Sequence, residues 1–101
     1  MYQDIFPEEL KRWQEQGAAL IDVRETYEYA KGHVPSAKNI PLSEFQQRLT
    51  EVPDKVVLIC ASGNRSSQAA HYLDEHSYTQ VANLMGGTFG WAQRGLPVDR
   101  A

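Results

Sequence analysis

The residue best placed for chemistry is Cys60, the only cysteine among the 101 residues. It follows the continuous apolar run 56–59 and precedes a short segment that contains Gly63 and Arg65. A helix start leaves several backbone N–H groups unpaired, and Gly63 lets the loop curl so that these donors converge on one anion. The helix dipole and the charge of Arg65 lower the pKa of a thiol from about 8.5 toward roughly 3.5–7.5. The segment therefore predicts a thiolate nucleophile facing a cradle for an oxyanion.

An inert cysteine is the alternative to this interpretation. A lone cysteine after an apolar strand is most often a small hydrophobic residue of the core. Glycine, arginine and a helix start follow Cys60 within five residues, and they favour a reactive thiol. The residues expected to surround the bound anion are Ala61, Ser62, Gly63, Asn64, Arg65 and Ser66. The single cysteine also excludes an internal disulfide framework and a multi-cysteine zinc site.

Alternating strands and helices are expected to position this loop. Strand signals are short apolar or β-branched runs bounded by turns, and they fall at 18–23, 37–40, 56–59 and 80–84. Helix signals are apolar residues on one face between turn residues, and they fall at 7–16, 25–32, 64–76 and 87–94. Ser43 and Gln46 form a capping-box pattern that predicts one more helix start, with Phe45 and Leu49 on one face.

The alternation predicts βαβ units and a mostly parallel sheet. The run 56–59 is apolar on both faces, which is typical of a central strand covered on both sides. Ligands of such sheets bind at the carboxyl ends of the strands. Cys60 stands at that end of the predicted central strand.

Length and composition predict one domain spanning 1–101, and 42% apolar residues suffice for one core. Ten basic and 13 acidic residues give a formal charge of −3, which offers no electrostatic case for nucleic acid or anionic membrane. The longest apolar run, 56–61, is far shorter than the roughly 20 residues that span a bilayer. The first residues lack the basic-then-apolar pattern of a secretory signal. We therefore expect a cytoplasmic protein without nucleic-acid or membrane partners.

Three separate stretches carry a resemblance to a known family. The first spans 21–41 and includes Gly32-His33-Val34-Pro35, the second is the loop 60–66, and the third spans 84–98 and includes Gly86-Gly87. In this order, and over nearly the whole chain, they resemble the single-domain rhodaneses, which are thiosulfate-type sulfurtransferases. The resemblance implies an α/β, rhodanese-like fold with a five-stranded, mainly parallel sheet and helices on both faces.

The resemblance also implies a ping-pong reaction. The Cys60 thiolate attacks the outer sulfur of a donor such as thiosulfate, sulfite leaves, and the persulfide on Cys60 passes its sulfur to a thiophilic acceptor. Backbone N–H groups from Ala61 to about Arg65 hold the persulfide, and Arg65 assists binding of the donor anion. No metal or organic cofactor is needed. The expected partners are small sulfur-containing anions, thiol acceptors and sulfur-donor proteins, and thiosulfate, a cysteine desulfurase persulfide and a polysulfide all fit as the donor.

Two other functions stay open at this point. The first is a phosphatase or arsenate reductase on the same fold, although those relatives place the arginine one residue later, where Ser66 stands. Four residues separate Cys60 from Arg65, and no second cysteine is present to reduce arsenate. The second is a non-catalytic rhodanese-like binding module, although such modules typically lack the cysteine that this chain has.

Several residues outside the loop are predicted to have structural or solvated positions. The side chains expected to hold segments together or pack inside are Asp22, Arg24, His33, Phe89 and Trp91. The side chains expected to be solvated are Glu25, Glu28, His71 and His76. Gly86 and Gly87 are expected to meet a backbone constraint in a tight turn near the loop.

Overall fold

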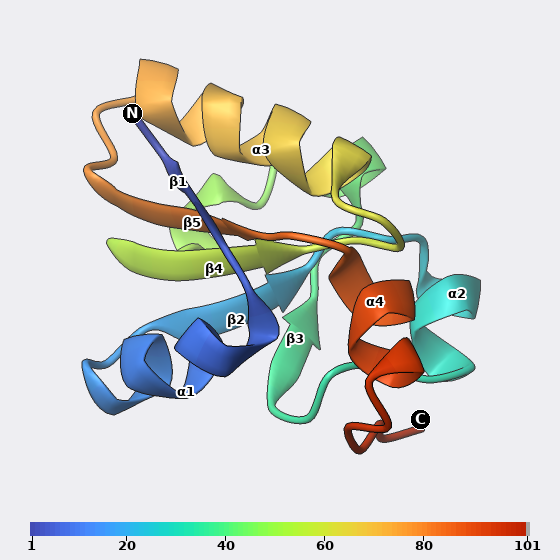
Figure 1. The fold of residues 1–101 in the computed structure, drawn as a ribbon. Coiled ribbons are helices and arrows are strands. Elements are labelled where there is room, and N and C mark those ends of the chain that lie inside the picture. The colour runs from blue at the N-terminus through green and yellow to red at the C-terminus, as the bar shows by residue number, and fades with distance from the viewer. Residues whose placement is uncertain (101) are drawn as a thin grey trace.

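The computed structural model describes residues 1–100, and it is an α/β fold built on a five-stranded parallel sheet (Figure 1). The elements in chain order are β1 (Gln3–Ile5), α1 (Pro7–Glu15), β2 (Ala19–Asp22), α2 (Thr26–Ala30), β3 (Ala37–Asn39), β4 (Lys55–Ile59), α3 (Asn64–Glu75), β5 (Gln80–Leu84) and α4 (Gly87–Gln93). The strand order across the sheet is β1-β5-β4-β2-β3. The fold class expected from the resemblance is confirmed.

The central strand is β4, as its apolar run predicts. Val56, Val57, Leu58 and Ile59 are all fully buried. The strand pairs with β2 on one side and β5 on the other, so both of its edges are hydrogen-bonded. A strand with both faces and both edges covered is held firmly, and Cys60 follows its last residue.

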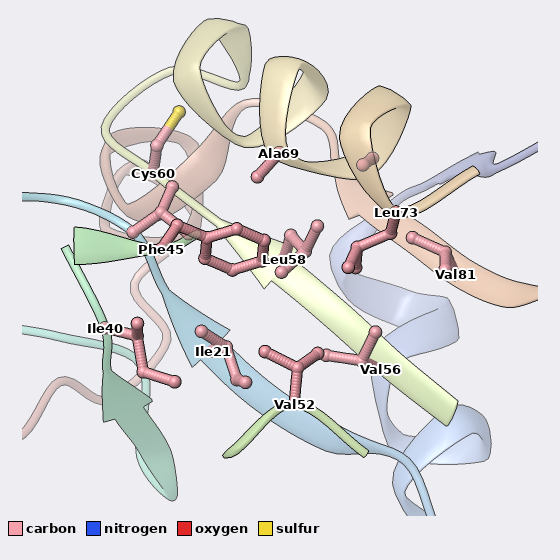
Figure 2. Close-up of a cluster of buried hydrophobic side chains, with 12 residues drawn as sticks. Ile21, Ile40, Phe45, Val52, Val56, Leu58, Cys60, Ala69, Leu73 and Val81 are labelled. Atoms are coloured by element: carbon pink, nitrogen blue, oxygen red, sulfur yellow. The ribbon is translucent and has the colours of Figure 1, made fainter. Parts of the chain in front are cut away.

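Helices cover both faces of the sheet, and each face has its own core. On one face α3 places Ala69, Ala70 and Leu73 against side chains of β2, β4 and β5, and Figure 2 shows most of this cluster. On the other face α1 contributes Leu10 and Trp13, while Trp91 of α4 packs at the border of the second cluster. The predicted inward faces of α1 and α3 are therefore confirmed. None of the helices described for residues 1–100 has the length and apolar character needed to cross a bilayer.

The helices and strands of the structure differ from the sequence-based expectation at two places. Strand β1 was not predicted, because it has three residues and buries only Ile5 while it adds to the edge of β5. The helix predicted from the capping box at Ser43 is wrong. Two separate 3₁₀ turns, Leu42–Glu44 and Leu49–Glu51, occupy this region, and the Ser43 hydroxyl donates to the Glu25 carboxylate (3.2 Å) instead of capping a helix. Phe45 packs into the core between the turns, and this tertiary contact overrides the local helix signal.

Candidate active site around Cys60

Cys60 begins the loop that joins β4 to α3 at the carboxyl end of the sheet. The residue is 1% exposed. In Figure 2 its sulfur points away from the neighbouring core side chains. The Gly63 N–H donates to Sγ over 3.0 Å, and the Ser66 hydroxyl lies 3.3 Å from Sγ. The loop therefore curls back over the sulfur and offers donors to it, as the sequence of small residues predicts.

The surroundings of the thiol favour its charged form. Burial by itself raises the pKa of Cys60, but hydrogen bonds from the Ser66 hydroxyl and from the backbone N–H groups of Ser66, Gly63 and Ser62 lower it and outweigh the burial. The pKa of Cys60 is therefore below its usual value. Hydrogen bonds to a thiolate also align donors with any negative charge that develops on an attached sulfur atom. This geometry suits a covalent nucleophile more than an inert core cysteine.

A chain of polar side chains lies behind the thiol; it is buried at Ser66 and Asn83 and exposed at Asp4. The Ser66 hydroxyl donates to Oδ1 of Asn83 and also contacts Sγ. The Asn83 amide donates to Asp4 over 3.1 Å and to the Gly63 carbonyl over 3.4 Å. Because a hydroxyl has one proton to donate, Ser66 can donate either to Sγ or to Asn83 at one time. Asn83 and Asp4 were missed by sequence reasoning; the available signal was a polar residue inside the apolar strand β5.

Arg65 is fixed by a carboxylate from another helix. Its two terminal nitrogens donate to Glu28 of α2 over 2.7 and 2.9 Å, a bidentate pair. The hydrogen bonds from Arg65 lower the pKa of Glu28 to about 2. The expectation that Glu28 lies on a solvated helix face is therefore wrong, because α2 places this residue beside the start of α3. The pair restrains the guanidinium next to the loop.

Helix α4 supports the loop from the other side. The N–H groups of Thr88 and Phe89 donate to the carbonyls of Cys60 (2.8 Å) and Ala61 (3.0 Å). At Gly87, whose φ is +57°, a Cβ would lie 2.3 Å from the Cys60 carbonyl oxygen. Only glycine allows this approach, so the predicted backbone constraint near the loop is confirmed at Gly87.

The remaining loop residues have distinct positions. Ala61 and Arg65 are half-buried, Gly63 and Ser66 are buried, and Ser62 and Asn64 are exposed. The structure thus gathers Gly63 and Ser66 around Sγ through their hydrogen bonds, with a contribution from the Ser62 N–H. No hydrogen bond links the Asn64 side chain to another residue within 1–100, and its carbonyl accepts from Ser67.

Structural roles are confirmed for Asp22, Arg24 and His33. The Asp22 carboxylate accepts from Nε and Nη2 of Arg24 at 2.9–3.1 Å, both side chains are buried, and Arg24 also donates to the Gly32 carbonyl (2.7 Å). His33 is buried in a turn, with Nδ1 3.0 Å from the Tyr29 carbonyl. These contacts tie β2 to the segment that follows α2.

Aromatic and histidine predictions have mixed outcomes. Trp91 is half-buried and its indole N–H donates to the Pro97 carbonyl (2.7 Å). Phe89 was expected in the core, but 61% of it is exposed, because it lies on the outer side of the short helix α4. His71 and His76 are exposed, as predicted. Within the described part of the chain, no cluster of three or more potential metal ligands occurs.

Comparison with known proteins gives a consistent set of relatives. Residues 6–94 match the rhodanese-like domain. A protein of Allochromatium vinosum described as a sulfurtransferase is 42% identical over 81 residues, which cover 78% of this chain and 76% of that protein. The thiosulfate sulfurtransferase GlpE of Haemophilus influenzae is 29% identical over 102 residues, covering 99% and 97%. The crystal structure of a rhodanese-related protein from Thermoplasma volcanium has a TM-score of 0.87 at 30% identity, covering 99% and 100%.

Proposed function

Because the chain belongs to the rhodanese-like domain family, we propose that it is a sulfurtransferase that carries sulfur as a persulfide on Cys60. The proposed donor is thiosulfate or a similar sulfane-sulfur compound. The observation that carries the proposal is the position of Cys60: it directly follows the central strand, and its Sγ accepts a hydrogen bond from the Gly63 N–H and contacts the Ser66 hydroxyl. The name of the Haemophilus influenzae relative supports thiosulfate as the donor.

The first half-reaction loads the sulfur. The Cys60 thiolate attacks the outer sulfur of thiosulfate, an S–S bond forms to Sγ, and the bond between the two thiosulfate sulfurs breaks. Sulfite leaves with that electron pair, so the sulfane sulfur changes partner and no external oxidant is needed. The loop N–H groups from Ala61 to Arg65 and the Ser66 hydroxyl stabilise the charge on the persulfide.

The second half-reaction unloads the sulfur. A thiophilic acceptor, which is cyanide in an assay and a thiol or a protein thiol in a cell, attacks the outer sulfur of the persulfide. The S–S bond breaks, and its electron pair returns to Sγ as the thiolate. Because the chain has one cysteine, an internal disulfide cannot release the sulfur, so release depends on an external acceptor.

Arg65 is proposed to attract the donor anion while Glu28 holds its guanidinium in place. The bidentate contact leaves the guanidinium half-buried beside the loop, with a third of the side chain exposed to an incoming anion. The ion pair is neutral at long range, so the attraction for a divalent anion comes from the start of α3 and from close contact with the exposed part of the guanidinium. Arg65 therefore contributes to binding of the donor more than to the transfer step.

Thiosulfate with cyanide tests the proposal through formation of thiocyanate, and mass spectrometry tests for one added sulfur atom on Cys60 after thiosulfate alone. The wild-type chain is expected to show both signals. Cys60→Ser, which preserves the size of the side chain, is expected to lose both. Sulfur loading or turnover in Cys60→Ser would contradict the proposed nucleophile. Hydrolysis of an aryl phosphate in place of sulfur loading would support the phosphatase alternative.

A further inference from the structure

Asn83 is a buried amide in an otherwise apolar part of β5. Its neighbours along the strand are apolar and buried, and Asn83 itself is 2% exposed. In the sheet it pairs in register with Leu58 of β4, two residues before Cys60, and with Asp4 of β1. Burying a side-chain amide is unfavourable unless its polar atoms find partners. The register of the sheet therefore decides which partners this amide meets.

The partners of the Asn83 amide fix its orientation. Its nitrogen lies 3.1 Å from the Asp4 carboxylate and 3.4 Å from the Gly63 carbonyl. Both of these groups are acceptors, and only the nitrogen of an amide donates. If the amide were turned over, its oxygen would lie against two acceptors. The amide oxygen therefore faces the Ser66 hydroxyl, which donates to it.

The Ser66 hydroxyl has two acceptors and one proton. Its oxygen lies 3.3 Å from Sγ of Cys60, so rotation about the Cβ–Oγ bond directs the proton either to Sγ or to Asn83. A charged thiolate is a strong acceptor, whereas a protonated thiol is a weak one. The sulfur and the amide oxygen therefore compete for the same proton, and the charge on Sγ decides the outcome.

We propose that Asn83 is a positioning residue that competes with Cys60 for the Ser66 hydroxyl and so limits how strongly Ser66 stabilises the free thiolate. The inference rests on the proposed sulfurtransferase function. A thiolate that is stabilised more strongly is a weaker nucleophile. In the persulfide the negative charge lies mainly on the outer sulfur, one bond further from Ser66, so Asn83 accepts the hydroxyl proton for more of the time. Asn83 thereby favours the sulfur-loaded state over the free thiolate.

Charged side chains close to the loop do not enter this competition. Four of them form two ion pairs, and the fifth is exposed and contacts the amide nitrogen; they are Arg65 with Glu28, Arg24 with Asp22, and Asp4. An uncharged replacement of Asn83 leaves all of them in place. Its effect on Cys60 therefore reports a change in hydrogen bonding.

Alkylation of Cys60 by iodoacetamide across a range of pH tests the competition in the unloaded protein. Asn83→Leu keeps the size of the side chain and removes the acceptor. We expect its pH profile to move to lower pH, because Ser66 then donates to the thiolate alone. A disordered loop would move the profile to higher pH, because the thiolate would lose the Gly63 donor. Asn83→Val removes the same acceptor with a residue that suits a strand, and it should move the profile in the same direction as Asn83→Leu.

Two controls isolate the route through Ser66. In a chain that carries Ser66→Ala, Asn83→Leu should leave the alkylation profile unchanged, because the hydroxyl through which Asn83 acts is absent. Gln80→Leu removes an exposed amide from the same strand and should also leave the profile unchanged. The proposal is overturned if the two Asn83 variants show no shift or a shift to higher pH, or if Asn83→Leu has the same effect with and without Ser66.

The preference for the loaded state is tested by equilibrating the protein with fixed ratios of thiosulfate to sulfite, at a pH above the alkylation midpoint of every variant. Mass spectrometry gives the loaded fraction. The equilibrium constant for loading should fall about two- to fivefold in Asn83→Leu, which corresponds to part of one hydrogen bond, and stay unchanged in Gln80→Leu. An unchanged constant in Asn83→Leu would refute this preference. A wild-type chain that takes up no sulfur would refute the proposed function alone, because the alkylation profiles are measured without sulfur.

Discussion

Replacing Gly87 by alanine would place a methyl group against the backbone of the Cys60 loop. The added Cβ would lie 2.3 Å from the Cys60 carbonyl oxygen and 2.7 Å from the carbonyl carbon and oxygen of Ala61. All three are backbone atoms, so rotation of a side chain does not relieve the overlap. The loop or the start of α4 has to move, and either movement strains the hydrogen bonds by which α4 holds the loop.

The size of the effect follows from two separate costs. The φ of +57° at Gly87 costs an L-residue about 1–2 kcal/mol. Overpacking against a neighbour that yields only by backbone movement adds about 1–3 kcal/mol. Gly95→Ala is the matched control, because Gly95 also has a positive φ (+74°) but no atom lies within 4 Å of its added Cβ. We expect Gly87→Ala to be destabilised by about 2–5 kcal/mol and Gly95→Ala by about 1–2 kcal/mol.

Urea unfolding gives the free energies, and mass spectrometry after a thiosulfate pulse gives the rate of sulfur loading. Loading should fall about 100-fold in Gly87→Ala, since a displacement of about 1 Å in a catalytic loop is enough for such a loss. It should be unchanged in Gly95→Ala. Equal stability of the two variants would refute the steric reasoning. A destabilised Gly87→Ala chain that loads sulfur at the wild-type rate would refute the link between α4 and the loop.

Three further changes test the contacts around the site. Ser66→Ala should raise the pKa of Cys60 and move the alkylation of Cys60 by iodoacetamide to higher pH, because the thiolate loses a hydrogen-bond donor. The control Ser67→Ala removes a hydroxyl that donates to the Asn64 carbonyl, and it should leave the pH profile of alkylation unchanged. Identical pH profiles in the two variants would count against a role of Ser66. Glu28→Gln should lower the free energy of unfolding by about 1 kcal/mol at pH 7. The folded-state pKa of Glu28 is about 2, below its usual 4.5, so this stabilisation is complete above pH 4.5 and is lost as the pH falls toward 2. If the free energies of unfolding of wild type and Glu28→Gln differ as much at pH 3 as at pH 7, the ion pair is contradicted. Arg24→Met should lower the free energy of unfolding by about 3–5 kcal/mol, because it leaves the fully buried Asp22 carboxylate without its partner. The control Arg94→Met breaks an exposed ion pair with Glu8 and should lower it by less than about 1 kcal/mol in a urea titration. Similar losses of stability in the two variants would refute the argument from burial.

The local sequence pattern was sufficient to predict the strand and the helix that carry the site. The apolar run before Cys60 predicted β4, and the apolar residues at Ala69, Ala70 and Leu73 predicted the buried face of α3. These signals are reliable because each element buries its own side chains with the period of its own backbone. The short edge strand β1 lacks such a signal, and its pairing at the sheet edge decides its conformation. The region after Ser43 has a local helix signal, but the packing of Phe45 overrides it.

The sequence by itself determined that one cysteine stands at the carboxyl end of a central strand, within a loop of small residues that leads to Arg65. Only the tertiary structure decided which groups face that loop. Glu28 is 37 residues from Arg65, and Asn83 is 17 residues from Ser66. Periodicity shows which face of an element is apolar, but it does not show which polar residue of another element that face will meet. Those contacts depend on how α2, α4 and β5 pack around the end of β4, and packing is a property of the whole fold.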